Sequence, residues 1–116
     1  MNTGPDGFVK VARAEQVLVG QPLALEMPGG RRLCLVRDGT EILAVADECA
    51  HQAFPLSAGD VLPGGTIECP WHGARFDCRT GSVLRGPAKD AISTYEVSVV
   101  DDTVYVRANG SRVTRG

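Results

Sequence analysis

Apolar and polar residues alternate at both ends of the chain, and this alternation predicts β-strands. A period of two is what a half-buried strand requires, because successive side chains point to opposite faces. The runs of this kind are FVKVARA (8–14), LALEM (23–27), RRLCLVRD (31–38), EILAVAD (41–47), STYEVSVV (93–100) and TVYVRA (103–108). The third and fourth runs are joined by Asp38-Gly39. That pair predicts a hairpin, since glycine accepts a positive φ without steric cost.

The middle of the chain, about residues 47–90, is rich in glycine and proline, which indicates irregular loops. Short strands such as TIEC (66–69) and ARFDC (74–78) are expected within this segment. A helical period is confined to one short turn in RAEQVL (13–18). We therefore predict an all-β protein with an antiparallel base and a small loop-built subdomain inserted at 47–90. Residues 1–116 are expected to form a single domain, with a frayed tail at about 109–116.

Charge and hydropathy exclude several functions. The 116 residues carry a formal net charge of −2, whereas nucleic-acid binding favours a basic surface. No apolar stretch has the length of a membrane span, and the N-terminus MNTGPDG has no features of a signal peptide. We expect a cytoplasmic protein with no nucleic-acid or membrane partner. Its four cysteines are then expected to stay reduced and to bind metal or pack.

Each of the two histidines lies within three residues of a cysteine, as Cys49-Ala-His51 and Cys69-Pro-Trp-His72. Thiolate and imidazole ligands suit zinc, copper or iron–sulfur clusters. Two of each would satisfy tetrahedral zinc, or a [2Fe–2S] cluster with two cysteines on one iron and two histidines on the other. Structural zinc modules usually pair like ligands with like. Two mixed loops therefore favour the cluster.

The pattern C-x-H, then C-x-x-H followed by glycine, resembles the Rieske [2Fe–2S] proteins. Further matching segments are PLSAG (55–59), CPWHGARFD (69–77), RTG (79–81) and GPA (86–88). The likeness covers roughly residues 40–106. It implies one Rieske-type [2Fe–2S] cluster, in a fold of antiparallel β-sheets with a small cluster-binding subdomain. It also implies the ligands of the two irons: Cys49 and Cys69 for the inner iron, His51 and His72 for the outer one.

The resemblance also bears on the redox potential. High-potential Rieske proteins place a serine and a tyrosine where this chain has Ala74 and Phe76, and those hydroxyls donate hydrogen bonds that stabilise the reduced cluster. The same relatives place a disulfide where this chain has Phe54 and Trp71. Without the donors and the disulfide, we expect a potential near the bottom of the Rieske range of about −150 to +300 mV.

The chain resembles a carrier more than a catalyst. Rieske oxygenases add a mononuclear iron held by two histidines and a carboxylate, but both histidines are already assigned to the cluster. No G-x-G-x-x-G motif indicates a nucleotide site. The resemblance implies a soluble ferredoxin, not itself an enzyme. It would pass single electrons from a flavoprotein reductase to the terminal oxygenase of an aromatic-ring dioxygenase. Alternatives are the small subunit of a larger reductase, such as nitrite reductase, and a zinc-stabilised interaction module.

Several further residues carry expectations of their own. The rings of His51 and His72 are expected at an exposed tip, inside an apolar collar of Phe54, Pro55, Trp71 and Pro87. Cys34 and Cys78 are expected to pack in the core. The acidic pairs Asp47–Glu48 and Asp101–Asp102 are expected in solvated turns.

Overall fold

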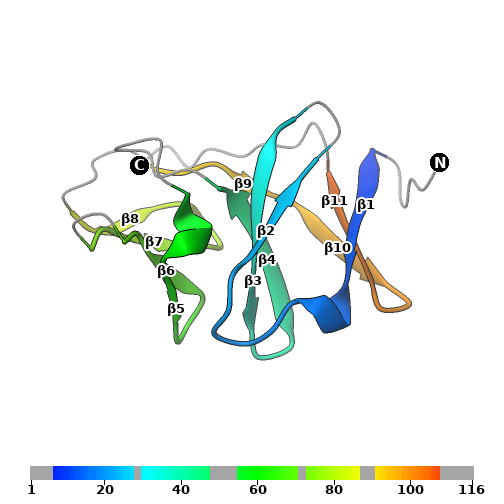
Figure 1. Cartoon of the computed structure of the whole chain (residues 1–116), viewed down its shortest axis with the longest axis horizontal. Coiled ribbons are helices and arrows are strands. Elements are labelled where there is room, and N and C mark those ends of the chain that lie inside the picture. The colour runs from blue at the N-terminus through cyan, green and yellow to red at the C-terminus, as the bar shows by residue number, and fades with distance from the viewer. Residues whose placement is uncertain (1–6, 28–29, 48–54, 71–72, 87–90, 108–116) are drawn as a thin grey trace.

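The computed structural model describes residues 7–27, 30–47, 55–70, 73–86 and 91–107. These residues form three antiparallel sheets, arranged in a row with the second in the middle (Figure 1). The first sheet has the order β1 (Phe8–Arg13), β11 (Thr103–Arg107), β10 (Val97–Val100). The second has the order β2 (Leu23–Glu26), β3 (Arg32–Asp38), β4 (Glu41–Ala46), β9 (Thr94–Tyr95). The third has the order β5 (Asp60–Leu62), β6 (Thr66–Glu68), β7 (Arg75–Asp77), β8 (Val83–Arg85).

The middle sheet is buried on both of its faces. Residues on one side of β3 and β4 pack with the third sheet, and these are Cys34, Val36, Leu43 and Val45. Residues on the other side pack with the first sheet, and these are Leu33, Leu35, Ile42 and Ala44. Because both faces are covered, these two strands contain nearly continuous apolar runs instead of strict alternation.

Two predicted hairpins are confirmed. In the first, Asp38 pairs with Glu41 across the turn, and Gly39 has a φ of +62°. In the second, Asp101 and Asp102 join β10 to β11 with φ values of +49° and +62°, and both side chains are exposed. Aspartate tolerates this left-handed conformation better than most residues. The solvated turn predicted there is therefore present.

The prediction of a single strand at 93–100 is wrong. The segment forms two strands in different sheets, since β9 pairs with β4 and β10 pairs with β11. Glu96 lies at the crossing, where its carbonyl oxygen accepts a hydrogen bond from the Arg107 backbone N–H at 3.0 Å. Alternation gives the face on which a side chain lies, but it does not give the partner strand.

The predicted all-β fold class is confirmed. Besides strands, the described parts contain only two one-turn 3₁₀ helices, η1 (Ala14–Gln16) and η2 (Leu56–Ala58). The short turn expected within 13–18 corresponds to η1. No helix in these parts is long and apolar enough to cross a membrane. The tail at 109–116 lies outside the described residues.

Candidate metal centre

Of the four predicted ligands, Cys69 is the one that the structure describes. Cys49, His51 and His72 lie outside the described residues, and so do Phe54, Trp71 and Pro87 of the predicted collar. In keeping with this, no group of three or more metal-binding side chains occurs among the residues that are described. The structure bears on the site through the residues that flank the two ligand loops.

The first loop, residues 48–54, is closed at its base by Asp47 and Ser57. One Asp47 carboxylate oxygen accepts a hydrogen bond from the Ser57 backbone N–H at 2.7 Å, and the other accepts one from Ser57 Oγ at 2.7 Å. Asp47 is only 5% exposed. The prediction that it lies in a solvated turn is therefore wrong. A buried carboxylate needs such donors, and here they join the chain before the loop to the chain after it.

The second loop, residues 70–73, is closed by the β6–β7 hairpin. Glu68 pairs with Arg75 in the register, and its Oε2 lies 3.0 Å from Arg75 Nε. The Cys69 backbone N–H donates to the carbonyl oxygen of Ala74 at 2.7 Å. Gly73 has a φ of +71°, a conformation that favours glycine. The hairpin thus brings the chain back immediately after the segment that carries His72.

Gly59, the glycine of PLSAG, brings the two loop bases into contact. A Cβ added at Gly59 would overlap the carbonyl oxygen of Glu68 and lie 3.1 Å from Pro70 Cδ. The segment that ends the first loop therefore lies directly against the residues on either side of Cys69. Only glycine leaves room for this approach.

Cys69 itself is fully buried, with 0% exposure. It belongs to the core cluster between the middle and third sheets, together with Leu56, Ala74 and Phe76. Ala74 and Phe76 are 1% and 0% exposed, and neither side chain can donate a hydrogen bond. The two positions on which the predicted redox potential depends are thus apolar and lie in the same core cluster as Cys69. The low potential itself stays a prediction.

Cys34 and Cys78 pack in the same core cluster, as predicted. Burial raises the pKa of the Cys34 thiol, and the nearby Asp47 carboxylate raises it further. Burial, with a contribution from Asp77, raises the pKa of Cys78 to about 12. Their burial in the core agrees with the packing role predicted for both residues.

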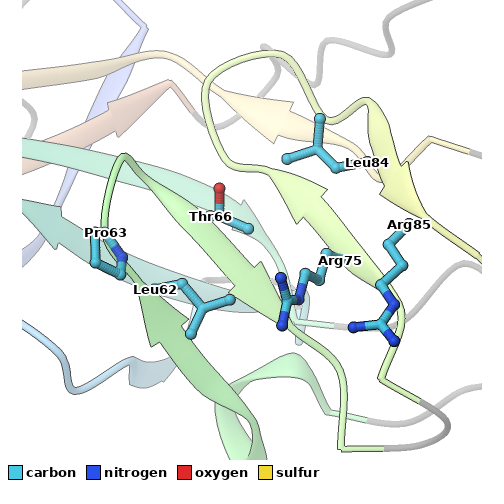
Figure 2. Close-up of a pocket in the computed structure, with 6 residues that line it drawn as sticks. All are labelled: Leu62, Pro63, Thr66, Arg75, Leu84 and Arg85. Carbon is cyan, nitrogen blue, oxygen red and sulfur yellow. The ribbon is translucent and has the colours of Figure 1, made fainter.

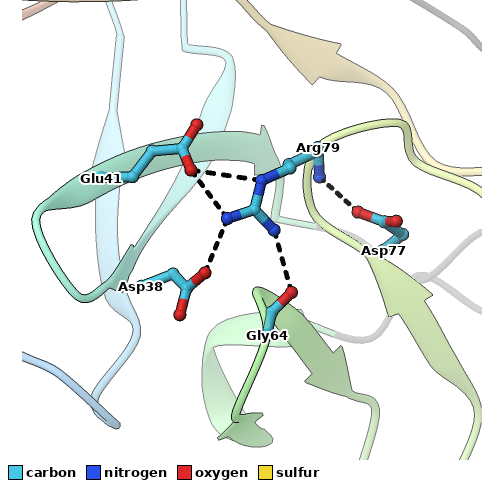
Figure 3. A network of polar contacts seen from close by, with 5 residues as sticks. All are labelled: Asp38, Glu41, Gly64, Asp77 and Arg79. Atoms are coloured by element: carbon cyan, nitrogen blue, oxygen red, sulfur yellow. Dashed lines mark hydrogen bonds and ion pairs between the residues drawn. The ribbon is translucent and has the colours of Figure 1, made fainter.

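Arg79 fastens the third sheet to the β3–β4 hairpin (Figure 3). Its Nη2 lies 2.6 Å from an Asp38 carboxylate oxygen and 2.7 Å from Glu41 Oε1, and its Nη1 donates to the Gly64 carbonyl oxygen at 2.9 Å. Its backbone N–H donates to Asp77 Oδ1 at 2.8 Å. The hydrogen bonds to Asp38 and Glu41 raise the pKa of the guanidinium. The sheet that carries Cys69 is thereby held against the middle sheet.

These features fit a metal group held between two loops. Each loop is closed at its base by hydrogen bonds, the bases touch at Gly59, and a buried cysteine lies beside that contact. Each loop also brings one sulfur and one nitrogen ligand within its sequence. Such a set of two sulfur and two nitrogen donors suits a binuclear centre with different ligands on its two metals.

Comparison with known proteins identifies the class. The Rieske [2Fe-2S] domain family matches residues 7–96, so the chain belongs to the Rieske [2Fe–2S] family, as the sequence motifs predicted. Membership implies one Rieske-type [2Fe–2S] cluster.

Individual relatives show which members of the Rieske family this chain is similar to. The ferredoxin component of the p-cumate 2,3-dioxygenase system of Pseudomonas putida is 31% identical over 99 residues, which cover 85% of this chain and 84% of that one. The human protein Apoptosis-inducing factor 3 is 39% identical over 90 residues, but these are 78% of this chain and only 14% of that protein.

Solved structures of related proteins share the fold of this chain. A chain from the complex of reduced oxygenase and oxidized ferredoxin in carbazole 1,9a-dioxygenase superposes with a TM-score of 0.82 at 32% identity, covering 90% of this chain and 95% of that one. A nitrite reductase small subunit from Mycobacterium tuberculosis superposes with a TM-score of 0.75 at 19% identity, covering 93% and 96%. The latter likeness extends to the fold alone.

Proposed function

We propose that this chain is a Rieske ferredoxin, a one-electron carrier between a flavoprotein reductase and a terminal ring-hydroxylating oxygenase. The observation that carries the proposal is the match with a ferredoxin component of a dioxygenase system, which covers 85% of this chain and 84% of that one. The solved ferredoxin–oxygenase complex supports an oxygenase as the electron acceptor. The chain is a carrier and not the catalyst, because its two histidines leave none for a mononuclear iron.

The cluster would be held by Cys49 and Cys69 on one iron and by His51 and His72 on the other. The burial of Cys69 and the contact between the loop bases support this assignment. When bound, the cluster takes up and releases one electron, passing between net charges of 0 and −1 with neutral imidazoles. The chain's own part is to hold the loops. Asp47, Ser57 and the Glu68–Arg75 pair close them, and Gly59 joins them.

The protein would act in the cytoplasm and meet its two partners transiently. A carrier must bind and release each partner within one cycle, which favours a small interface. We place that interface at the tip, where the rings of His51 and His72 would lie within the collar of Phe54, Pro55, Trp71 and Pro87. The low net charge and the lack of a membrane-length apolar segment in the sequence are consistent with this role.

A permanent subunit of a larger reductase is the second candidate. It is supported by the shared fold of a nitrite reductase small subunit, at an identity too low to carry function. Membership of the Rieske family argues against the third candidate, a zinc-stabilised interaction module.

Purification from the native organism separates the two leading candidates. A ferredoxin elutes alone at the mass of the single chain, whereas a permanent subunit elutes with its large partner. The isolated protein should also be red-brown, contain iron and acid-labile sulfide in equal amounts, and titrate with one electron. Colourless protein that contains zinc, or stable co-elution with a large reductase, would contradict the proposal.

A further inference from the structure

A shallow hollow of about 590 Å³ opens on the outer face of the third sheet. Figure 2 shows the residues that line it: Leu62, Pro63, Thr66, Arg75, Leu84 and Arg85. Ile67 and Phe76 point into the core. Their strand neighbours Thr66 and Arg75 therefore face outward. The hollow is separate from the core that holds Cys69.

The hollow brings two arginine side chains together on the outer face of the third sheet. Arg75 and Arg85 are paired directly opposite each other in the β7–β8 register. Like charges in this position destabilise a sheet. Arg75 contacts Glu68 through Nε, while Arg85 has no ion pair with any residue in the described parts of the chain. Glu68 offsets the charge of Arg75, so among the described residues the hollow retains the positive charge of Arg85, on a protein whose net charge is −2.

An exposed leucine lies next to these arginines. Leu84 is 55% exposed, and it is the extra residue where the register changes from Phe76–Val83 to Arg75–Arg85. Irregularities of this kind redirect a side chain. Leu84 lines the hollow together with Leu62 and Pro63. A contiguous apolar patch with a charged rim is typical of a protein interaction site.

The hollow adjoins the proposed cluster site. Arg75 is the first residue of β7 and follows the second loop, residues 70–73, with only Ala74 between them. Arg85 is its partner at the same end of β8. A protein seated on this hollow would therefore also reach the tip where electrons would enter and leave.

We propose that this hollow docks a redox partner through a carboxylate-rich patch that surrounds an apolar side chain. The carboxylates would pair with Arg75 and Arg85, and the apolar side chain would pack on Leu84. The inference rests on the proposed carrier function and adds the chemistry by which a partner is recognised. A small free anion would pair with the arginines without contacting Leu84. Dependence of binding on Leu84 therefore distinguishes a protein partner from a small anion.

The test is stopped-flow oxidation of the reduced holoprotein by three acceptors. These are cytochrome b5 as an acidic protein, cytochrome c as a basic protein, and ferricyanide as a small anion. In each reaction one electron leaves the cluster and reduces one ferric iron to ferrous iron. The test variant is Arg85→Glu. Its matched control is Lys10→Glu, which makes the same change of charge at an exposed site on β1, in the sheet at the far end of the row (Figure 1).

Arg85→Glu should slow the reaction with cytochrome b5 about tenfold at low ionic strength and accelerate that with cytochrome c, because steering acts on the association rate. Lys10→Glu should change either rate by less than about twofold, since its charge is screened over that distance.

Leu84→Ser should slow the reaction with cytochrome b5 about threefold and leave the reaction with ferricyanide unchanged, because only a protein covers Leu84.

Stability measurements exclude a folding effect. Arg85→Glu replaces a like-charge pair by an opposite-charge pair with Arg75, so its melting temperature should not fall. Equal effects of Arg85→Glu and Lys10→Glu would overturn the docking site. An unchanged cytochrome b5 rate in Leu84→Ser would overturn a protein partner in favour of small anions. If wild-type protein reduces none of the three acceptors, the carrier function itself fails.

Discussion

Gly59 lies where an added Cβ would overlap the carbonyl oxygen of Glu68, the residue before Cys69. We predict that Gly59→Ala separates the two loop bases. It should cost about 1–3 kcal/mol of unfolding free energy, as overpacking does, and reduce the iron retained on purification. Denaturant unfolding and iron analysis measure the two effects.

Gly86→Ala is the matched control. No atom lies within 4 Å of a Cβ added there, and Gly86 does not have a positive φ. The control should keep full iron content and wild-type stability. Equal iron loss in both variants would contradict the role given to Gly59.

Ala74 and Phe76 are buried beside Cys69 and lack hydrogen-bond donors. We predict that Ala74→Ser with Phe76→Tyr raises the midpoint potential by tens of millivolts. One hydrogen bond contributes about 0.5–1.5 kcal/mol, and about 59 mV corresponds to 1.4 kcal/mol for one electron. Ala44→Ser, buried on the opposite face of the middle sheet, should leave the midpoint unchanged in voltammetry. An unshifted midpoint in the double variant, with its cluster intact, would contradict the low-potential assignment.

Cys78 makes stability depend on pH in the alkaline range. Its pKa is raised from 9.0 to about 12 in the folded protein. The stabilisation that the buried, protonated Cys78 thiol contributes is therefore fully present below pH 9.0 and is lost as the pH rises toward 12. Over that window Cys78→Ala should have the shallower decline in unfolding free energy, by up to about 1.4 kcal/mol per pH unit. Parallel declines in denaturant titrations would show that the thiol is not buried as described.

The motifs predict four ligand residues, and this assignment stays a prediction. The core positions predicted for Cys34 and Cys78 are confirmed, but the residues that close the loops were not predicted. Asp47 was expected in solvent, because an Asp-Glu pair in sequence is indistinguishable from a solvated turn. Its burial depends on Ser57, ten residues away, and on donors that only the folded chain supplies. Ser57 lies in PLSAG, a segment that matches the Rieske family, but the match does not indicate a contact with Asp47.

The three sheets are joined by specific side chains as well as by their cores. Arg79, in the turn after β7, bonds to Asp38 and Glu41 of the β3–β4 hairpin and to Gly64 (Figure 3). We predict that Arg79→Ala lowers the melting temperature, and that the difference shrinks at about 1 M salt, where charges are screened. Arg79→Lys keeps the charge but not the planar fork, so it should restore only part of the loss. A melting temperature unaffected by Arg79→Ala would show that the cores alone hold the sheets together.

Strands with a clear local signal were predictable, and those defined by their partners were not. The β3–β4 hairpin follows from two apolar runs around Asp38-Gly39. β5 and β8 have three residues each and lie in a segment rich in glycine and proline, so no periodicity marks them. The break between β9 and β10 is set by two different neighbouring sheets, which the alternation of residues 93–100 does not contain.

The third sheet, whose strand β6 is directly followed by Cys69, lies at one end of the row of sheets, and we propose the redox site there. The third sheet, with Cys69 and the arginine hollow, lies on one side of the middle sheet, and the β1–β11–β10 sheet lies on the other (Figure 1). Both faces of the middle sheet are needed for this arrangement, since each supports one outer sheet. An end position suits a carrier, because a partner can approach the site without contacting the rest of the molecule.

The most direct test of the account is pulsed EPR of the dithionite-reduced protein, with His51→Ala measured in parallel. We predict one [2Fe–2S] signal with hyperfine couplings from two imidazole nitrogens, and the loss of that signal in the variant. A signal without nitrogen coupling, or an unchanged signal in His51→Ala, would contradict it.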